Sequence, residues 1–194
     1  PVSVRMIREI HATLMAGVRG GRLQPGELST SQNWIGPAGA TLAEATFIPP
    51  PPHEVPQALS DLGRFLHGPS GLPPLVQVGL AHAQFETIHP FLDGNGRMGR
   101  LLIAFLLTEK HLLSKPVLYL SHYFRQHRTD YYEHLQAIRD RGDWEGWIAF
   151  FLEGVTVISR EAAQTAAGIL RMREEYRSRI TEQLGRAAAN GQRV

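Results

Sequence analysis

Residues 89–100 read His-Pro-Phe-Leu-Asp-Gly-Asn-Gly-Arg-Met-Gly-Arg, a polar and glycine-rich stretch between two apolar segments. The flanking segments 73–87 and 99–113 have the length and spacing of helices, and the second is nearly all apolar from Leu101 to Leu107. A helix that is apolar on all sides is buried, so we expect 99–113 to be the central helix of a bundle. The stretch is then a loop fixed at the rigid start of that helix.

The remainder of the chain reads mainly as helix. Helical spacing of apolar residues covers 4–18, 53–66, 121–139 and 144–184. Two short strand-like pieces, Gln32–Ile35 and Leu42–Ile48, flank a turn at Gly36-Pro37-Ala38-Gly39, and a run of four prolines follows. The sequence predicts an all-α fold with one small β-hairpin at about residues 31–48.

Composition narrows the class of protein. With 194 residues, 43% of them hydrophobic, the chain can form one globular domain, which we place at residues 1–160. It has no cysteine, which excludes disulfides and thiolate chemistry. No signal peptide or membrane-length apolar run is present, so we expect a cytoplasmic protein without membrane contact.

The two ends of the sequence suggest a longer protein. The chain begins with Pro1, and its last segment, 161–194, mixes arginines with glutamates. We interpret that pattern as a solvated helix face leading into a further domain. Nucleic-acid binding is then expected only through such a domain, if at all.

The loop has the residue types of a phosphate site. Gly94 and Gly96 allow positive φ angles and close approach of a ligand, and successive amides can form an anion-binding nest. The start of the following helix directs its amides to the same place. Arg97 and Arg100 lie three residues apart on one helix face and can each donate two hydrogen bonds to phosphate.

The loop also carries groups for catalysis. Asp93 can share Mg²⁺ with phosphate oxygens, and a neutral His89 can accept a proton from an incoming hydroxyl. Phe91 alternates with these polar residues and is expected to anchor the loop. Each residue alone has a plainer explanation, as a turn glycine, a turn aspartate or a helix cap, but together they favour a nucleotidyl transferase.

The stretch resembles the signature of the Fic family, His-x-Phe-x-Asp/Glu-Gly-Asn-Gly-Arg-x-x-Arg, at every fixed position. The resemblance extends over about residues 4–160. Residues 31–36 with 45–52 resemble the family's flap hairpin, and 118–139, with the pair Tyr131-Tyr132, resembles the segment that closes over the nucleotide base.

The resemblance implies transfer of AMP from ATP to a Ser, Thr or Tyr hydroxyl of a target protein. It assigns the roles as follows: His89 as the base, Asp93 as the Mg²⁺ ligand, Gly94, Asn95 and Gly96 as the anion hole, Arg97 and Arg100 as ligands of the β- and γ-phosphates, and Phe91, Tyr131 and Tyr132 in the nucleotide site. Thr46, Phe47 and Ile48 of the flap would bind an extended segment of the target protein by strand addition.

Two departures from the family pattern matter. Arg139 stands where members carry an asparagine near the base, so it is not assigned a role. The family's inhibitory helix, Ser/Thr-x-x-x-Glu-Gly/Asn, is matched only in part, at Thr129–Glu133 and Ser178–Glu182. We therefore expect Arg100 to be unblocked, the protein to be constitutively active, and any inhibitory helix to come from a preceding segment or another chain.

Other activities stay open at this point. A related enzyme could transfer phosphate or another nucleotide, or remove AMP, although Gly96 disfavours the kinase-like branch and the missing inhibitory glutamate disfavours AMP removal. His82 and Glu86, four residues apart and close to His89, could instead belong to a metal-dependent hydrolase. A non-catalytic regulatory module is the remaining alternative.

Overall fold

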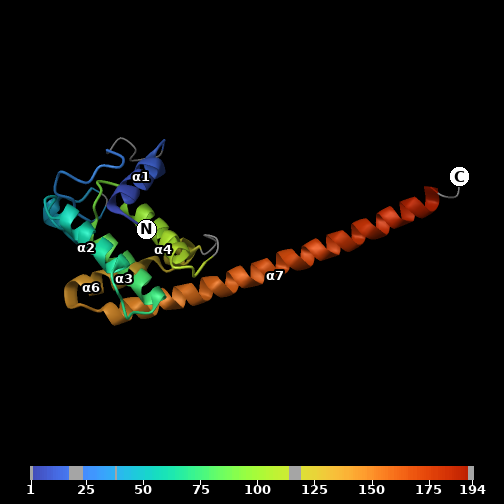
Figure 1. Cartoon of the computed structure of the whole chain (residues 1–194). Coiled ribbons are helices and arrows are strands. Elements are labelled where there is room, and N and C mark those ends of the chain that lie inside the picture. Colours follow the sequence, from blue (N-terminus) through green and yellow to red (C-terminus); the bar gives the residue numbers. More distant parts are fainter. Residues whose placement is uncertain (1, 18–23, 38, 114–118, 192–194) are drawn as a thin grey trace.

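The chain folds into helices and connecting segments, with no β-sheet in the described residues (Figure 1). The computed structural model describes residues 2–17, 24–37, 39–113 and 119–191, and the side chains as far as residue 185. Val18, Ala38 and Leu118, which belong to predicted elements, lie outside the described residues. The all-α part of the sequence prediction is confirmed.

Helix α3 (Pro74–Ile88) lies among three other helices in the globular part (Figure 1). It packs against α2 (Val55–His67), α4 (Asn95–Glu109) and α7 (Trp144–Gly191). Buried residues occupy several of its faces, so it carries no single apolar stripe. The glycine-rich loop that begins at His89 follows the C-terminus of this helix.

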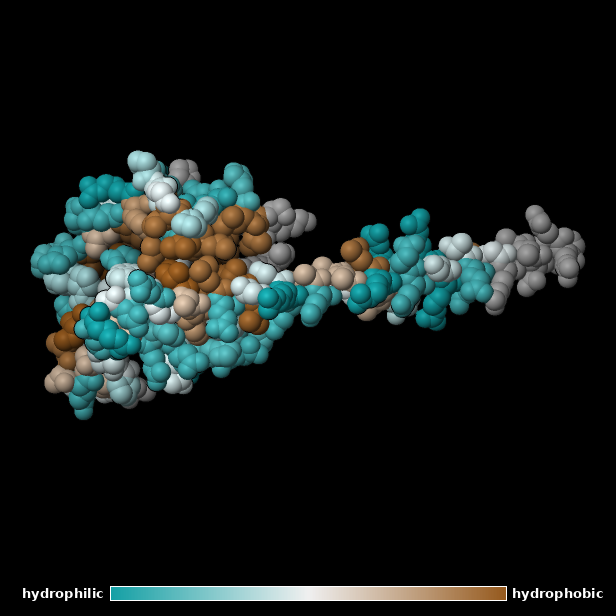
Figure 2. Space-filling model, turned by 90° about the horizontal axis from the view of Figure 1, so that it is seen from below, coloured by the Kyte–Doolittle hydropathy of each residue, from teal (hydrophilic) through white to brown (hydrophobic). Residues whose placement is uncertain are grey.

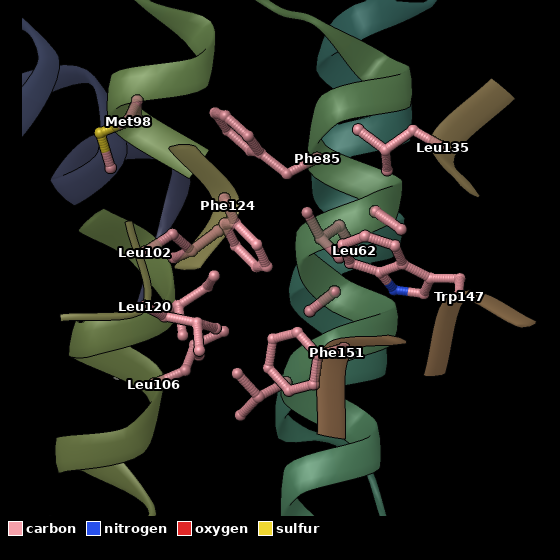
Figure 3. Close-up of a cluster of buried hydrophobic side chains, with 14 of the residues drawn as sticks. Leu62, Phe85, Met98, Leu102, Leu106, Leu120, Phe124, Leu135, Trp147 and Phe151 are labelled. Carbon is pink, nitrogen blue, oxygen red and sulfur yellow. The ribbon is translucent and has the colours of Figure 1, made fainter. Parts of the chain in front are cut away.

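An aromatic core fills the space between α3, α4 and α7 (Figure 3). Trp147 and Phe151 of α7 are fully buried, and the indole Nε1 of Trp147 donates to the carbonyl of Gly79 at 2.9 Å. A Cβ on Gly79 would lie 2.9 Å from Cδ1 of Phe151, so glycine is what lets α7 approach α3 this closely. The core therefore fixes α3, and with it the first residue of the loop.

Helix α4 differs from its prediction. It was expected to be the central helix, buried on all sides, but Phe105 is 37% exposed and Leu101 is only partly buried. Its buried face packs against α3 and α1 (Val4–Met15). The central place belongs to α3 because small residues such as Gly79 and Ala83 allow neighbours on several sides.

The helix predicted for residues 121–139 is divided. It forms α5 (Leu120–Gln126) and α6 (Arg128–Arg141), with His127 between them at φ −105° and ψ 45°. The break changes the direction of the chain, so both helices pack against α7. α6 ends at Arg141 and is capped by Gly142, whose φ of 71° suits glycine.

The predicted β-hairpin at residues 31–48 is wrong. The described residues there contain a single antiparallel bridge between Ile35 and Phe47, with Ile35 N–H donating to the Phe47 carbonyl at 2.8 Å. A 3-10 helix at Leu42–Glu44 occupies residues that a second strand would need. Prolines 49–52 then follow, and they have no N–H to extend the ladder.

Helix α7 continues without a break across the predicted domain boundary at residue 160. Its residues as far as Ile158 contribute to the core, and beyond them the helix projects away from the globular part (Figure 1). The surface of the projecting part alternates between hydrophilic and hydrophobic groups (Figure 2). Among the described residues, no helix combines the length and the apolar character needed to cross a bilayer.

Candidate active site

The loop between α3 and α4 begins and ends with residues in the left-handed region. His89 caps α3 at φ 49° and ψ 58°, and its N–H donates to the Phe85 carbonyl at 3.0 Å. Gly94 precedes the first turn of α4 at φ 82°. A histidine with positive φ is uncommon. The backbone of His89 is therefore locally strained, and this conformation turns its side chain out of the helix.

Side chains from two places in the sequence, Asn95 and Asn33, hold Phe91 of the loop. The amide of Asn95 accepts from the Phe91 N–H at 2.9 Å and donates to the Phe91 carbonyl at 2.6 Å. Asn33, from the predicted flap, also donates to that carbonyl, at 2.7 Å. Asn95 is 2% exposed, so its side chain fixes the loop and leaves anion binding to backbone groups.

Phe91 lies inside the fold. Its ring is fully buried and stacks on the imidazole of His11, with 3.7 Å between ring centroids. His11 Nδ1 accepts from Gly26 N–H at 2.9 Å, which leaves Nε2–H to donate to the Asp93 carbonyl at 2.9 Å. The Phe91 side chain thus anchors the loop instead of facing an open site. His11 and Asn33 were not expected from the sequence.

The two loop glycines have different roles. Positive φ was predicted for both, but only Gly94 has it, and a Cβ there would lie 2.6 Å from Sδ of Met15. Gly96 belongs to the first turn of α4. A Cβ on Gly96 would lie 3.0 Å from Nη1 of Arg100, so its absence makes room for that guanidinium.

The start of α4 has the character of an anion site. The first N–H groups of a helix have no partner within it, and the helix dipole favours negative charge at that end. Arg97 lies beside it with its Nη2 3.6 Å from Oδ2 of Asp93, and both side chains are about two-fifths exposed, at 36% and 42%. Oδ1 of Asp93 accepts from Gly94 N–H at 2.6 Å, so Oδ2 is the oxygen that can face a ligand.

The His89 imidazole is uncharged at neutral pH. Burial lowers its pKa to about 4, and the nearby Arg139 charge adds to this effect, while the Glu86 carbonyl and Asp93 oppose it. Nδ1 is buried without a hydrogen-bond partner, and the Glu86 carbonyl is the backbone group that favours a ring proton. A proton on Nδ1 leaves Nε2 as the acceptor nitrogen.

A buried carboxylate lies behind the loop. Glu86 is 6% exposed, and its Oε1 has no hydrogen-bond partner. Burial raises the Glu86 pKa to about 7, although the charges of Arg100 and Arg139 oppose the shift. Gly99 is what admits this side chain, because a Cβ there would lie only 2.3 Å from Oε1.

His82 is a structural residue of the core. Its Nδ1 lies 3.0 Å from the Gly99 carbonyl, its Nε2 lies 3.0 Å from the Tyr131 hydroxyl, and burial lowers its pKa to about 4. Both ring nitrogens are therefore occupied. The described residues contain no group of three or more His, Cys, Asp or Glu side chains able to hold a metal ion. This geometry gives no support to the metal-dependent hydrolase.

A cavity of about 410 Å³ opens beside Arg100, a size typical of small-molecule sites. Its wall comes mainly from α5, α6 and the residue before α5, and includes Tyr119, His122, Arg125, Arg128 and Tyr132. Apart from Tyr132, the sequence analysis missed these residues. The spacing of His122 and Arg125 on one face of a helix was the available signal.

The tyrosine pair divides between core and cavity. Tyr131 also contacts the cavity, but it is 3% exposed and its hydroxyl is bonded to His82. Tyr132 is 51% exposed, with the Arg128 guanidinium 5.7 Å from its ring centroid. Tyr132 is thus the better placed of the two to stack on a base.

The predicted flap residues lie near the loop. Thr46 and Ile48 are exposed, and Phe47 is partly buried beneath the Arg139 guanidinium, 3.9 Å from its ring centroid. Arg139 also donates to the Glu86 carbonyl at 3.2 Å. Arg139, left without a role in the sequence analysis, therefore connects the flap to the end of α3.

Comparison with known proteins accounts for this arrangement. A family model described as Fic/DOC matches residues 1–107, more than half of the chain. The chain belongs to the Fic/DOC family. A crystal structure of a Fic family protein from Desulfovibrio desulfuricans G20 superposes with a TM-score of 0.71 at 30% identity, covering 84% of this chain and 47% of that one.

Sequence relatives support the same placement. The chain is 29% identical over 154 residues to the protein adenylyltransferase Fic of Drosophila erecta, covering 78% of this chain and 28% of that protein. It is 40% identical over 70 residues to a probable protein adenylyltransferase of Aquifex aeolicus, covering 36% of this chain and 22% of the relative. The chain thus spans about a quarter of the length of these curated relatives.

The two partial matches to an inhibitory helix lie on α6 and α7. Thr129–Glu133 falls in α6, where Glu133 is exposed. Ser178–Glu182 falls on the projecting part of α7, away from the loop (Figure 1). The carboxyl group that does interact electrostatically with Arg100 is that of the buried Glu86.

Proposed function

We propose that this Fic domain transfers AMP from ATP to a hydroxyl group of a target protein. The observation that carries the proposal is the position of His89, a neutral imidazole at one end of a loop whose other end is the anion-binding start of α4. The curated relatives named as protein adenylyltransferases support this choice of reaction.

The reaction follows from what the residues can do. The target hydroxyl oxygen attacks the α-phosphorus of ATP, and its proton passes to Nε2 of His89. The bond between the α-phosphorus and the bridging oxygen breaks, and pyrophosphate leaves with the bonding electrons. A pKa of about 4 keeps the His89 ring free of a second proton before attack. The product is an AMP-protein phosphodiester.

The charged residues stabilise the phosphates. Amides at the start of α4 would hold α-phosphate oxygens, Arg97 the β-phosphate and Arg100 the γ-phosphate. Asp93 would be the protein ligand of Mg²⁺, which neutralises charge between phosphates. Asp93 fits this ion, because Mg²⁺ in nucleotide sites takes one or two carboxylates and completes its shell with phosphate and water, and the Asp93 side chain is 42% exposed.

The cavity and the flap segment complete the site. The cavity beside Arg100 would take the nucleotide, with Tyr132 stacking on the base and Arg125 and Arg128 supplying positive charge. Thr46 and Ile48 are exposed. The N–H of Thr46 already donates to the Ile35 carbonyl at 2.8 Å, so an extended target segment could add backbone hydrogen bonds at Ile48, beyond the single bridge. Since the bridge is short, target binding would itself extend the pairing.

Labelled ATP distinguishes the transfers. The protein is incubated with a cell lysate and ATP carrying the label at the α- or the γ-phosphate. We expect protein-bound label from the α-position only. Label from the γ-position alone would refute AMP transfer and indicate phosphoryl transfer, and mass spectrometry of the product identifies the nucleotide. Release of AMP from a target protein that already carries it would instead indicate AMP removal.

His89→Ala tests the base. The variant is expected to lose transfer while its affinity for ATP, measured by calorimetry, changes less than about threefold, because His89 contributes to the reaction and not to phosphate binding. His53→Ala is the matched control, since His53 is largely exposed. Transfer by His89→Ala at the wild-type rate would refute the assignment.

Activity of the unmodified chain without any activator tests the expectation that it is constitutively active.

A further inference from the structure

The carbonyl of Glu86 lacks the partner that a helix normally provides. In α3 it would accept from the N–H of the residue four positions later, which is Pro90, and proline has no N–H. The carbonyl is therefore available to side chains. Nη2 of Arg139 donates to it at 3.2 Å, and the same carbonyl favours a proton on the His89 ring. One oxygen thus serves both the guanidinium of α6 and the ring of the proposed base.

The Arg139 guanidinium is held by two hydrogen bonds on its edge. Nη2 donates to the Glu86 carbonyl, and Nη1 donates to Oε1 of Gln136 at 3.4 Å. Gln136 is in turn fixed on α6, because its Nε2 donates to Oδ1 of Asp140 at 2.8 Å. A planar guanidinium that donates from its edge still has its face free for stacking. That face lies on the Phe47 ring, 3.9 Å from the ring centroid.

The flap segment, residues 31–48, is paired with itself at one point. Among its described residues, Ile35 and Phe47 form a single bridge, in which each residue donates its N–H to the carbonyl of the other. Such a short pairing is weak on its own, so side-chain contacts help to set the direction of the chain beyond it. Phe47 is partly buried under Arg139, whereas the next residue, Ile48, is exposed. The stack on Phe47 therefore sets the direction in which Ile48 is presented.

We propose that Arg139 is a positioning residue that fixes the flap segment relative to His89. Its face orients Phe47, and with it Ile48, where a target segment would pair. Its edge bonds the carbonyl near the end of α3, three residues before the base. A target hydroxyl then reaches the same place relative to Nε2 in each encounter, which lowers the entropic cost of the reaction. The inference rests on the proposed AMP transfer, but the contact that it describes can be tested without any activity.

An arginine can fill this role, whereas a lysine cannot fill it completely. A guanidinium stacks its face on a ring and donates from its edge at the same time, whereas an ammonium is a point charge on a flexible stem. If Arg139 acted only through its positive charge, by disfavouring a second proton on the His89 ring, a lysine would replace it. Positioning and charge therefore give different expectations for the variant Arg139→Lys.

The first experiment measures hydrogen exchange at the bridge in the full chain by NMR. The N–H groups of Ile35 and Phe47 report on the bridge, and the buried Phe85 of α3 reports on global stability. In Arg139→Ala we expect the two bridge amides to exchange at least about fivefold faster, and Phe85 to change less than about twofold. Arg141→Ala is the matched control on the same helix, since Arg141 is 68% exposed. Equal exchange at the bridge in the two variants would overturn the proposal.

The second experiment compares rates of protein labelling in a cell lysate supplied with α-labelled ATP. We expect Arg139→Ala to lower the rate at saturating ATP at least about fivefold and to leave the KM for ATP within about twofold, because Arg139 orients the acceptor and not the phosphates. Arg139→Lys should stay below about one third of the wild-type rate. A wild-type rate in Arg139→Lys would overturn positioning in favour of charge alone. A raised KM for ATP would place Arg139 in the nucleotide site instead.

A double-mutant cycle tests whether Arg139 acts through Phe47. Phe47→Leu removes the ring but keeps an apolar side chain, so it abolishes the stack on Arg139. We expect the double variant Phe47→Leu/Arg139→Ala to label protein no more than about twofold more slowly than the slower single variant. Single effects that multiply would show that the two residues act separately, which contradicts the proposal. A wild-type chain that labels no protein refutes AMP transfer itself, and the exchange rates at the bridge then decide on the Arg139 contact alone.

Discussion

The buried carboxyl of Glu86 should make the stability of this protein depend on pH in a measurable way. Burial raises the Glu86 pKa from 4.5 to about 7. Above its folded pKa the native state holds a buried charge, whereas the unfolded state ionises freely above 4.5. The native state therefore loses stability relative to the unfolded state as pH rises from 4.5 to 7, by about 3 kcal/mol in full.

The substitution Glu86→Gln isolates this effect. Glutamine keeps the size of the side chain but cannot ionise, so its free energy of unfolding lacks the decline with pH. We expect the stability of the variant minus that of the wild type to increase by about 2–3 kcal/mol between about pH 5 and pH 8. The buried histidines act in the opposite direction. His82 and His89 have pKa values of about 4, so the native state loses stability relative to the unfolded state as pH falls below 6.5. They are present in both proteins and cancel in the difference.

Urea unfolding followed by tryptophan fluorescence supplies the measurement, since Trp147 is fully buried in the core. Glu133→Gln, an exposed glutamate on α6, is the matched control and should show a difference that does not vary with pH. A Glu86→Gln difference that stays constant within about 1 kcal/mol over the same range would refute the reasoning. It would mean that the carboxylate is solvated or paired in the native state.

Three further substitutions test the packing around the site. Gly99→Ala places a Cβ 2.3 Å from Oε1 of Glu86 and should lower the free energy of unfolding by about 1–3 kcal/mol, measured in urea. Arg139→Ala removes the guanidinium stacked on Phe47 and should speed proteolytic cleavage of the flap segment, with cleavage at an unchanged rate as the contrary result. Tyr132→Ala should weaken ATP binding about tenfold in calorimetry, because stacking on a base contributes about 1–3 kcal/mol, and unchanged affinity would show that the base lies elsewhere.

The sequence predicted the helical class and the loop between α3 and α4 because both depend on local signals. Apolar spacing defines α3 and α4 within a few residues, and residues 89–100 have a pattern too long to arise by chance. The prediction of a hairpin failed because an alternation of apolar residues is typical of a strand but does not by itself produce one. Whether a strand forms depends on the presence of a partner strand with a free edge. A 3-10 turn at Leu42–Glu44 satisfies the backbone locally instead.

The roles of residues that act through tertiary contacts could mostly not be predicted from the sequence. Tyr131 and Tyr132 are adjacent and of the same type, yet one belongs to the core and the other to the cavity. The difference arises from the break at His127, which sets the rotation of α6 against α7. No local sequence pattern predicts that rotation. The sequence could therefore indicate the tyrosine pair, but not which tyrosine belongs to the core and which to the cavity. Arg139 was likewise unassigned until the fold placed it over Phe47.

The loop shows why a motif alone does not make a site. Its chemistry is local, since His89, Asp93 and Arg97 lie within nine residues, but its shape depends on residues far away. Asn33 bonds to the Phe91 carbonyl across 58 positions, and His11 bonds to the Asp93 carbonyl across 82. Positive φ at His89 is strained and persists only where such contacts hold the backbone. The preorganisation that phosphoryl chemistry requires therefore comes from α1 and the flap segment, and a chain with the same loop but without these two contacts would retain the reactive groups and lose their alignment.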